Sequence, residues 1–183
     1  MKDYNKILFL KINGLIGKSK WLDAFGEAGA EWVILGMVFW YVSGVFVVHY
    51  PNFQSAFSDI FWLAAVWIFT FLLSFFIGFL VKEPRPRLKI PESEQLFKPL
   101  SNWKSFPSDH ASAAFLVFFM ALIFHLPLAW ALLPMALWVV WGRVYAGLHY
   151  PFDIIGGAVL AALTVTIFYI CILFPFWSSR ILG

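Results

Sequence analysis

The segment 143–153 contains three side chains that could take part in catalysis. Arg143 stands at the end of a long apolar stretch, and His149 is followed four residues later by Asp153. An arginine in hydrocarbon costs about 3 kcal/mol at a helix centre, so it usually has a partner or a task. A carboxylate four residues after a histidine predicts a hydrogen-bonded pair that fixes the imidazole tautomer and leaves the other nitrogen free to attack. Singly, these residues also fit an interfacial anchor or a helix cap.

A second candidate segment is Pro107-Ser108-Asp109-His110, which directly precedes an apolar run. Proline and serine are typical of helix starts, and a helix N-terminus offers free N–H groups and a positive dipole end to a phosphate. Ser108 would add a hydroxyl donor, and His110 could protonate a departing oxygen. Taken alone, the tetrapeptide equally fits an ordinary capped helix.

A third segment, 82–87, carries three cations, Lys82, Arg85 and Arg87, among two prolines. The prolines block helix continuation and favour extended backbone. Such a cluster could hold phosphate groups or act as a juxtamembrane headgroup anchor.

The chain that carries these segments has the composition of a membrane protein. Of its 183 residues, 62% are hydrophobic and only 13% are charged, and the mean hydropathy is +0.81. A soluble globule of this size could not bury so much apolar surface, and the same numbers exclude disorder. The single cysteine, Cys171, excludes an internal disulfide and a metal site built on several thiolates.

Charge-free stretches predict the membrane spans. There are four of them, at 32–58, 60–81, 111–142 and 154–179. The third is too long for one crossing, and Pro127 at its centre predicts a tight hairpin between spans near 108–126 and 128–147. We therefore predict an all-α polytopic membrane bundle of about five transmembrane helices.

The rest of the chain is expected to lie at the membrane surface or in one loop. Apolar residues interleaved with lysines over 1–30 predict an interfacial amphipathic helix. The segment 82–107 is the expected active-site loop, and the whole chain, 1–183, is expected to form a single membrane-embedded domain.

Five spans bring the candidate residues to one membrane surface. The hairpin at Pro127 decides this, because without it His110 and Arg143 would be about 50 Å apart along one helix. The residues expected to share the surface are Arg85, His110, Arg143, His149 and Asp153.

Three parts of the chain, in the same order, resemble the signature of the type 2 phosphatidic acid phosphatase/haloperoxidase superfamily, in its integral-membrane branch. These parts are Arg85-Pro86, Pro107-Ser108-Asp109-His110, and Arg143 with His149 six residues later and Asp153 four beyond that. Each part lies beside a predicted span, and the resemblance covers roughly residues 20–175.

The resemblance implies a metal-independent phosphatase that works through a phosphohistidine. His149 would be the nucleophile, Asp153 would orient it, and His110 would be the general acid for the leaving oxygen. The phosphoryl oxygens would be held by Arg85, Arg143 and Ser108. No metal or other cofactor is implied, since a cationic cradle can take a metal's place in phosphoryl transfer.

The chain departs from the family pattern at three positions. The family usually has lysine seven residues before the arginine of Arg-Pro, where this chain has Gly78, and Lys82 could stand in for it. It often has glycine where Asp109 stands and usually serine where Gly142 stands. These departures put the identity of the phosphate-binding cations in question.

The combination Glu83-Pro84-Arg85-Pro86 with Pro107-Ser108-Asp109-His110 is similar to bacterial undecaprenyl-pyrophosphate phosphatases. It implies an isoprenyl diphosphate substrate and a place in the bacterial plasma membrane, in cell wall biogenesis. The expected partners are the lipid substrate and the bilayer, with no nucleic acid. Phosphatidylglycerophosphate or phosphatidate would fit the same residues, as would a non-catalytic lipid-binding or transport protein.

The distribution of cations conflicts with that role. Twelve of the 13 lysines and arginines fall on the candidate site's face, and the positive-inside rule would place that face in the cytoplasm. Recycling of undecaprenyl pyrophosphate would need it on the outer side, so the sequence leaves the orientation open.

Overall fold

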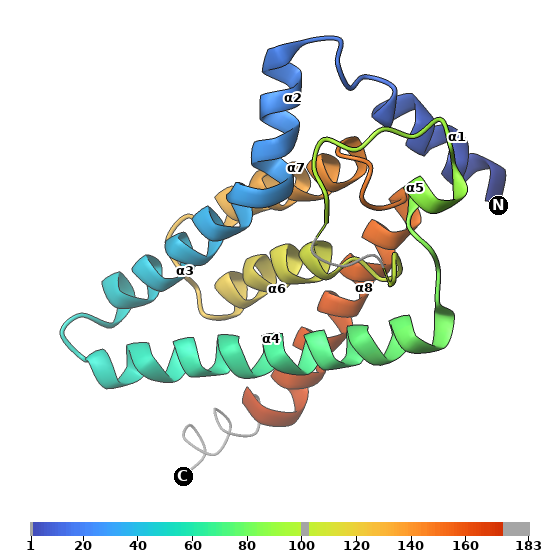
Figure 1. Ribbon diagram of the computed structural model, residues 1–183. Coiled ribbons are helices and arrows are strands. Elements are labelled where there is room, and N and C mark those ends of the chain that lie inside the picture. Colours follow the sequence, from blue (N-terminus) through green and yellow to red (C-terminus); the bar gives the residue numbers. More distant parts are fainter. Residues whose placement is uncertain (1, 100–102, 174–183) are drawn as a thin grey trace.

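Two long helices form the outer arms of the bundle in the computed structural model, which describes residues 2–99 and 103–173. Helix α2 (Lys20–Glu27) continues through a π-helical segment (Ala28–Trp32) into α3 (Val33–His49). After a turn at 50–52 the chain returns as α4 (Phe53–Val81), whose first turn is capped by the Asn52 side chain. Figure 1 shows α3 and α4 diverging from this turn as the two arms of a V.

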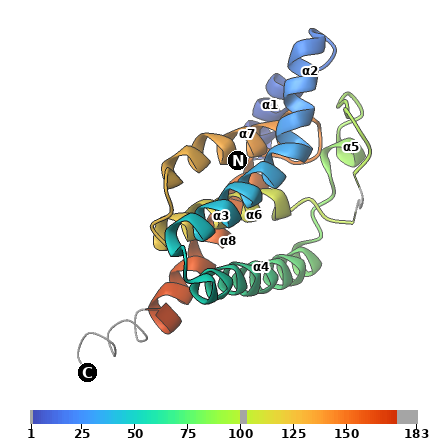
Figure 2. The same cartoon turned by 90° about the vertical axis from the view of Figure 1, so that its left-hand side faces the viewer.

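Helix α6 (Asp109–Ile123) lies inside the V and is the most enclosed helix of the bundle (Figures 1 and 2). The chain then turns through 124–128, forms a 3₁₀ turn (Ala129–Ala131) and returns as α7 (Leu132–Tyr145). Two residues of the turn, His125 and Leu128, adopt the left-handed conformation. The hairpin predicted at Pro127 is therefore confirmed.

Helix α8 (Pro151–Phe168) crosses behind α4 in Figure 1 and ends in a π-helical segment (Tyr169–Leu173). It packs most extensively on α6. The contact is close because small residues line it: a Cβ built at Gly157 would lie 2.6 Å from the Ser108 carbonyl oxygen and 2.8 Å from Ala111 Cβ. Small residues at such crossings let helix backbones approach in membranes.

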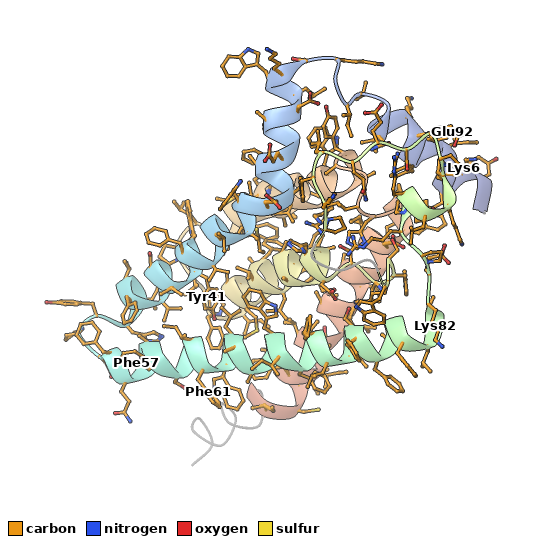
Figure 3. The ribbon with its side chains drawn as sticks, in the orientation of Figure 1. Lys6, Tyr41, Phe57, Phe61, Lys82 and Glu92 are labelled. Atoms are coloured by element: carbon orange, nitrogen blue, oxygen red, sulfur yellow. The ribbon has the colours of Figure 1, made fainter. Side chains whose placement is uncertain are left out.

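The predicted fold class is confirmed. The described residues contain helices and no strand. Three helices, Lys20–His49, Phe53–Lys89 and Pro151–Ile172, are long and apolar enough to cross a membrane, and two shorter apolar helices complete the five. Large apolar side chains such as Phe57 and Phe61 point outward from α4 (Figure 3), as expected of a lipid-facing surface.

The structure moves two predicted boundaries at the N-terminal end. Only α1 (Lys2–Asn13) is a separate surface helix, and its Phe9 is fully buried. Residues 20–30, predicted as interfacial, instead begin the first long helix, because they contain no proline and Phe25 stacks on Trp138 with ring centroids 4.3 Å apart.

The first turn also differs from the charge-based prediction, which placed it at 58–60. It lies at 50–52, and Asp59 is inside α4, where its Oδ2 is 2.7 Å from His49 Nε2. A paired carboxylate can enter a helix that an unpaired one would interrupt. Of the last predicted span, 154–179, residues 174–179 lie outside the described part, as do 100–102 of the predicted loop.

The close α6–α8 crossing predicts opposite effects for two glycine-to-alanine substitutions. Alanine usually stabilises a helix interior by about 1 kcal/mol relative to glycine. Gly36→Ala should show this gain, since its Cβ would meet only Met135 Cε at 3.5 Å. Gly157→Ala should instead lower the unfolding midpoint in detergent, and an unchanged or raised midpoint for Gly157→Ala would contradict the crossing.

Candidate active site

His149 lies in the turn between α7 and α8 and is 3% exposed. Its Nδ1 is 2.9 Å from the Ser105 carbonyl oxygen, and its Nε2 is 3.5 Å from Arg85 Nη1. A carbonyl oxygen can only accept a hydrogen bond, so Nδ1 carries the proton. Nε2 then carries the lone pair and accepts a long hydrogen bond from Arg85 Nη1, so the atom that could attack phosphorus lies beside a guanidinium group that could bind the phosphoryl oxygens.

Asp153 does not make the hydrogen bond to His149 that the four-residue spacing predicted. Its Oδ2 is 3.7 Å from Nδ1, too far for a hydrogen bond. The same oxygen accepts bonds from Ser105 Oγ at 2.5 Å and from the Tyr150 backbone N–H at 2.7 Å. Asp153 therefore positions His149 indirectly: it binds the hydroxyl of Ser105, whose carbonyl oxygen accepts from the imidazole.

Ser105 is thus a site residue that sequence reasoning missed. Its carbonyl fixes the tautomer of His149 and its hydroxyl binds Asp153. Its N–H also donates to the Glu83 carbonyl oxygen at 2.6 Å, which ties the loop to the start of the Arg85 segment. The only sequence signal was its position two residues before Pro107, in the loop already expected to form the site.

Arg85 precedes the short helix α5 (Pro86–Lys89), and its side chain is buried beneath the loop. Its Nη1 donates to the Leu148 carbonyl oxygen at 2.9 Å, one residue before the nucleophile. This anchor fixes the guanidinium beside His149 Nε2.

Arg143 is held in the same way from the other side of the site. It lies in the last turn of α7, and its Nη1 donates to the Ala30 carbonyl oxygen at 3.0 Å. Ala30 belongs to the π-helical segment, and such segments leave backbone groups out of the regular ladder. The contact needs Gly142, since a Cβ there would lie 2.5 Å from the Ala30 backbone nitrogen, and this accounts for glycine in place of the family's serine.

The two arginines share an unusual feature: both Nε atoms are buried and, within the part of the chain that the structure describes, have no hydrogen-bond partner. A buried charged donor without a partner is costly, by about 1–3 kcal/mol or more. A phosphoryl group has the acceptor oxygens that such donors lack. The pair is therefore arranged to receive an anion.

The start of α6 supplies the remaining predicted residues. Ser108 is the N-cap, as predicted, and its Oγ accepts from the Ala111 N–H at 3.4 Å. His110 lies in the first turn, where the charges of Arg143 and Arg85 act on it. The structure thus brings together the predicted residues Arg85, Ser108, His110, Arg143, His149 and Asp153.

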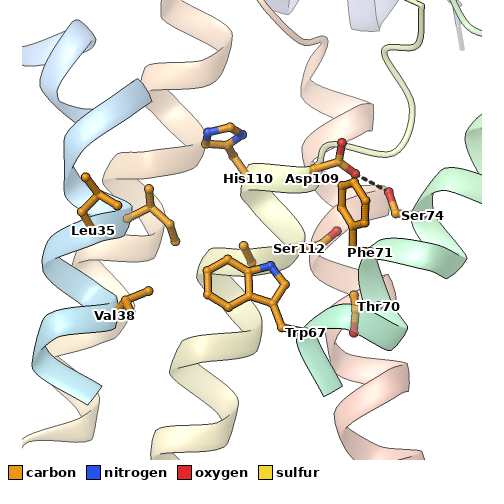
Figure 4. A pocket seen from close by; sticks show the side chains of 11 residues that line it. Leu35, Val38, Trp67, Thr70, Phe71, Ser74, Asp109, His110 and Ser112 are labelled. Atoms are coloured by element: carbon orange, nitrogen blue, oxygen red, sulfur yellow. Dashed lines mark hydrogen bonds between the residues drawn. The ribbon is translucent and has the colours of Figure 1, made fainter. Parts of the chain in front are cut away.

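A cavity of about 250 Å³ leads from this helix start into the V between α3 and α4 (Figure 4). Ser74, Asp109 and His110 supply polar groups to its wall. Leu35 and Val38 of α3 line one side of it, and Trp67 and Phe71 of α4 line the other (Figure 4). Leu35 and Phe71 are themselves largely exposed, so the cavity opens sideways between α3 and α4.

Lys82, proposed from the sequence as a phosphate-binding residue, does not join the cluster. It is the exposed C-cap of α4, its Nζ is 5.1 Å from the centroid of the Phe79 ring, and it points outward in Figure 3. A different lysine, Lys104, is buried beside the site. The loop that carries it crosses back over α4, a placement that sequence spacing could not indicate.

Burial lowers the pKa of His149 well below its ordinary value, and the nearby Arg143 and Arg85 lower it further. The imidazole is therefore neutral at neutral pH, which is the form that can attack phosphorus. The Ser105 carbonyl opposes this shift but does not reverse it.

Sequence comparisons give a family match and two relatives. The model of the PAP2 superfamily matches residues 59–177. The chain is 32% identical over 109 residues to a Bacillus licheniformis protein named bacitracin transport permease protein BcrC, across 59% of this chain and 49% of that protein, so it spans about half the length of that relative. It is 24% identical over 165 residues to undecaprenyl-diphosphatase BcrC of Bacillus subtilis (strain 168), across 90% and 82% of the two chains.

Two solved structures share the fold. The crystal structure of Aquifex aeolicus LpxE superposes with a TM-score of 0.67 at 23% identity, covering 90% of this chain and 93% of that one. A transmembrane PAP2-type phosphatidylglycerolphosphate phosphatase from Bacillus subtilis superposes with a TM-score of 0.62 at 19% identity, covering 91% and 85%.

The neutral, buried His149 predicts a pH-dependent stability. In the unfolded chain its pKa returns to about 6.5. As the pH falls below that value, the unfolded state binds a proton that the native state does not bind, and the native state loses stability relative to it. Between pH 7.5 and 5.5 the wild type should lose about 1.4 kcal/mol of unfolding free energy more than His149→Gln. Denaturant unfolding in detergent micelles at the two pH values measures this, and equal losses in the two proteins would contradict a neutral native imidazole.

Proposed function

The chain belongs to the PAP2 superfamily, and from that premise we propose that it is a metal-independent lipid phosphatase of the bacterial plasma membrane. Its proposed substrate is an isoprenyl diphosphate, with undecaprenyl pyrophosphate converted to undecaprenyl phosphate. The observation that carries the proposal is the pair of buried Nε–H donors of Arg85 and Arg143, which find no partner among the described residues, close to the deprotonated Nε2 of His149.

In the first step, His149 Nε2 attacks the terminal phosphorus and forms a nitrogen–phosphorus bond. The bond from that phosphorus to the bridging oxygen breaks, and the bridging oxygen takes a proton from His110 as it leaves with the lipid. Arg85, Arg143 and the Ser108 hydroxyl hold the three phosphoryl oxygens. As charge builds on these oxygens, fixed donors in a water-poor site stabilise it.

In the second step, water attacks the phosphohistidine. His110, which gave up a proton in the first step, accepts the proton of this water, the nitrogen–phosphorus bond breaks, and inorganic phosphate leaves. His149 returns to its neutral state, with Nδ1 still donating to the Ser105 carbonyl and Asp153 still holding the Ser105 hydroxyl. Neither step requires a metal, because the guanidinium pair carries the charge that a metal would otherwise offset.

The cavity supports a lipid as the substrate. The leaving oxygen carries the lipid chain and must lie beside His110, and the cavity runs from His110 to an apolar opening between Leu35 and Phe71. A hydrocarbon chain could follow this path into the bilayer while its phosphates stay beside His110. The relative named undecaprenyl-diphosphatase, matched over most of both chains, supports the isoprenyl diphosphate in particular.

The assay must also distinguish two alternative functions, because a specific observation favours each. The shared fold with a phosphatidylglycerolphosphate phosphatase favours a glycerolipid substrate. The relative named as a transport permease favours a protein that binds lipid without turnover.

The decisive assay measures phosphate release by the purified protein in detergent from undecaprenyl pyrophosphate, phosphatidylglycerophosphate and phosphatidate. We expect the fastest release from the diphosphate, no loss of rate with EDTA, and a drop of about 10³-fold or more in His149→Ala. His125→Asn is the matched control, since His125 is exposed in the turn between α6 and α7, and it should keep the wild-type rate.

Three outcomes would overturn parts of this proposal. Release that survives His149→Ala would remove the nucleophile, and release that needs Mg²⁺ would remove the metal-independent mechanism. Saturable binding of intact lipid with no release from any of the three substrates would identify a binding or transport protein instead.

A further inference from the structure

Lys104 is a buried lysine that the proposed reaction does not use. It is 5% exposed, and its ammonium is surrounded by acceptors from three parts of the chain. Nζ lies 2.8 Å from Ser74 Oγ on α4, 2.7 Å from Asp109 Oδ1 at the start of α6, and 3.2 Å from the Pro107 carbonyl oxygen. A lysine is seldom buried without a task, because its charge must be fully compensated there.

Gly78 makes room for this lysine. A Cβ built at Gly78 would lie 2.3 Å from Lys104 Cδ, so the lysine stem crosses α4 directly over the missing side chain. A glycine inside a helix costs about 1 kcal/mol relative to alanine, and here the space it leaves is occupied by the stem of a residue from the loop. The same position is where the family pattern has lysine, so the chain places a lysine at this point of the site from a different segment.

Asp109 shows what the ammonium does. Its carboxylate is on the wall of the cavity next to His110 and forms a hydrogen bond with Ser74 (Figure 4). It is close enough to offset the charges of Arg85 and Arg143. Without a cation beside it, this carboxylate would repel a phosphate and weaken the cradle made by the two arginines.

We propose that Lys104 is a positioning residue that neutralises and holds Asp109, so that the phosphoryl site stays cationic. Lys104 acts through the charge of its ammonium beside Asp109, and the missing side chain of Gly78 leaves room for the lysine stem. The inference rests on the proposed phosphatase function. It accounts together for two departures from the family pattern, glycine at 78 and aspartate at 109, which the sequence presents as unrelated.

The first test moves the lysine from the loop to the helix. Lys104→Met keeps the stem without the charge and should lower kcat/KM roughly 10–100-fold. A helical side chain leans toward the N-terminal turn, so a lysine at 78 would direct its ammonium toward Ser74. Gly78→Lys combined with Lys104→Ala should therefore recover most of the wild-type kcat/KM. Lys98→Met, an exposed lysine of the same loop, is the matched control and should change nothing.

The second test asks whether the carboxylate is the group that Lys104 offsets. In Lys104→Met/Asp109→Asn the unpaired carboxylate is gone, so kcat/KM should rise at least about fivefold above that of Lys104→Met. A further variant, Gly78→Ala, keeps Lys104 but displaces its stem, so its kcat/KM should fall toward that of Lys104→Met. A purely structural lysine would not make the fall in kcat/KM depend on the Asp109 carboxylate.

Three results would overturn the role of Lys104 while leaving the proposed function standing, provided that phosphate release still depends on His149. These are wild-type kcat/KM in Lys104→Met, failure of the relocated lysine to restore kcat/KM in a folded protein, and no gain from removing the Asp109 carboxylate. Activity that persists in His149→Ala would instead refute the proposed function and leave the contribution of Lys104 to be measured on its own.

Discussion

The structure depends on keeping two guanidinium groups buried at the edge of a bilayer while leaving part of each unsatisfied. Arg85 and Arg143 are each anchored through one nitrogen to a backbone carbonyl, of Leu148 and Ala30 respectively, and each retains a buried Nε for which residues 2–99 and 103–173 provide no partner. Burying such charges is expensive unless something compensates them. The anchors keep the groups in place, and the remaining donors are those that we propose for the phosphoryl group.

Several features of the fold follow from this requirement. The π-helical segment between α2 and α3 provides the Ala30 carbonyl, and Gly142 lets that segment approach α7. The close α6–α8 crossing at Gly157 brings Ser108 against the helix that carries Asp153, whose carbonyl accepts the Ser108 N–H. The cavity between α3 and α4 has Asp109 and His110, at the start of α6, on its wall, and this places the open side of the bundle next to the cluster of arginines and histidines.

Local sequence was a good guide where the chemistry of neighbouring residues decides the structure. Pro127 ended one apolar helix and began another, and Ser108 capped α6 as its position before an apolar run indicated. Charge-free stretches were a poorer guide to helix ends, because Asp59 enters α4 by pairing with His49 and residues 20–30 are held in the first long helix by packing on α7. A charge can lie inside a membrane span when a partner compensates it, and a charge-free stretch does not reveal that partner.

The sequence by itself determined the membrane class, the helical fold and the rough positions of the five spans, because the length of an apolar stretch and the position of a proline act locally. It also predicted that His149, His110, Arg85 and Arg143 lie on one face, because their order along the chain and the hairpin at Pro127 place them there. Only the tertiary structure decided that Ser105, and not Asp153, holds the imidazole, and that Lys104 lies over Gly78 while Lys82 points away. Those contacts join segments separated by tens of residues, and their geometry depends on how the loop packs across the helices.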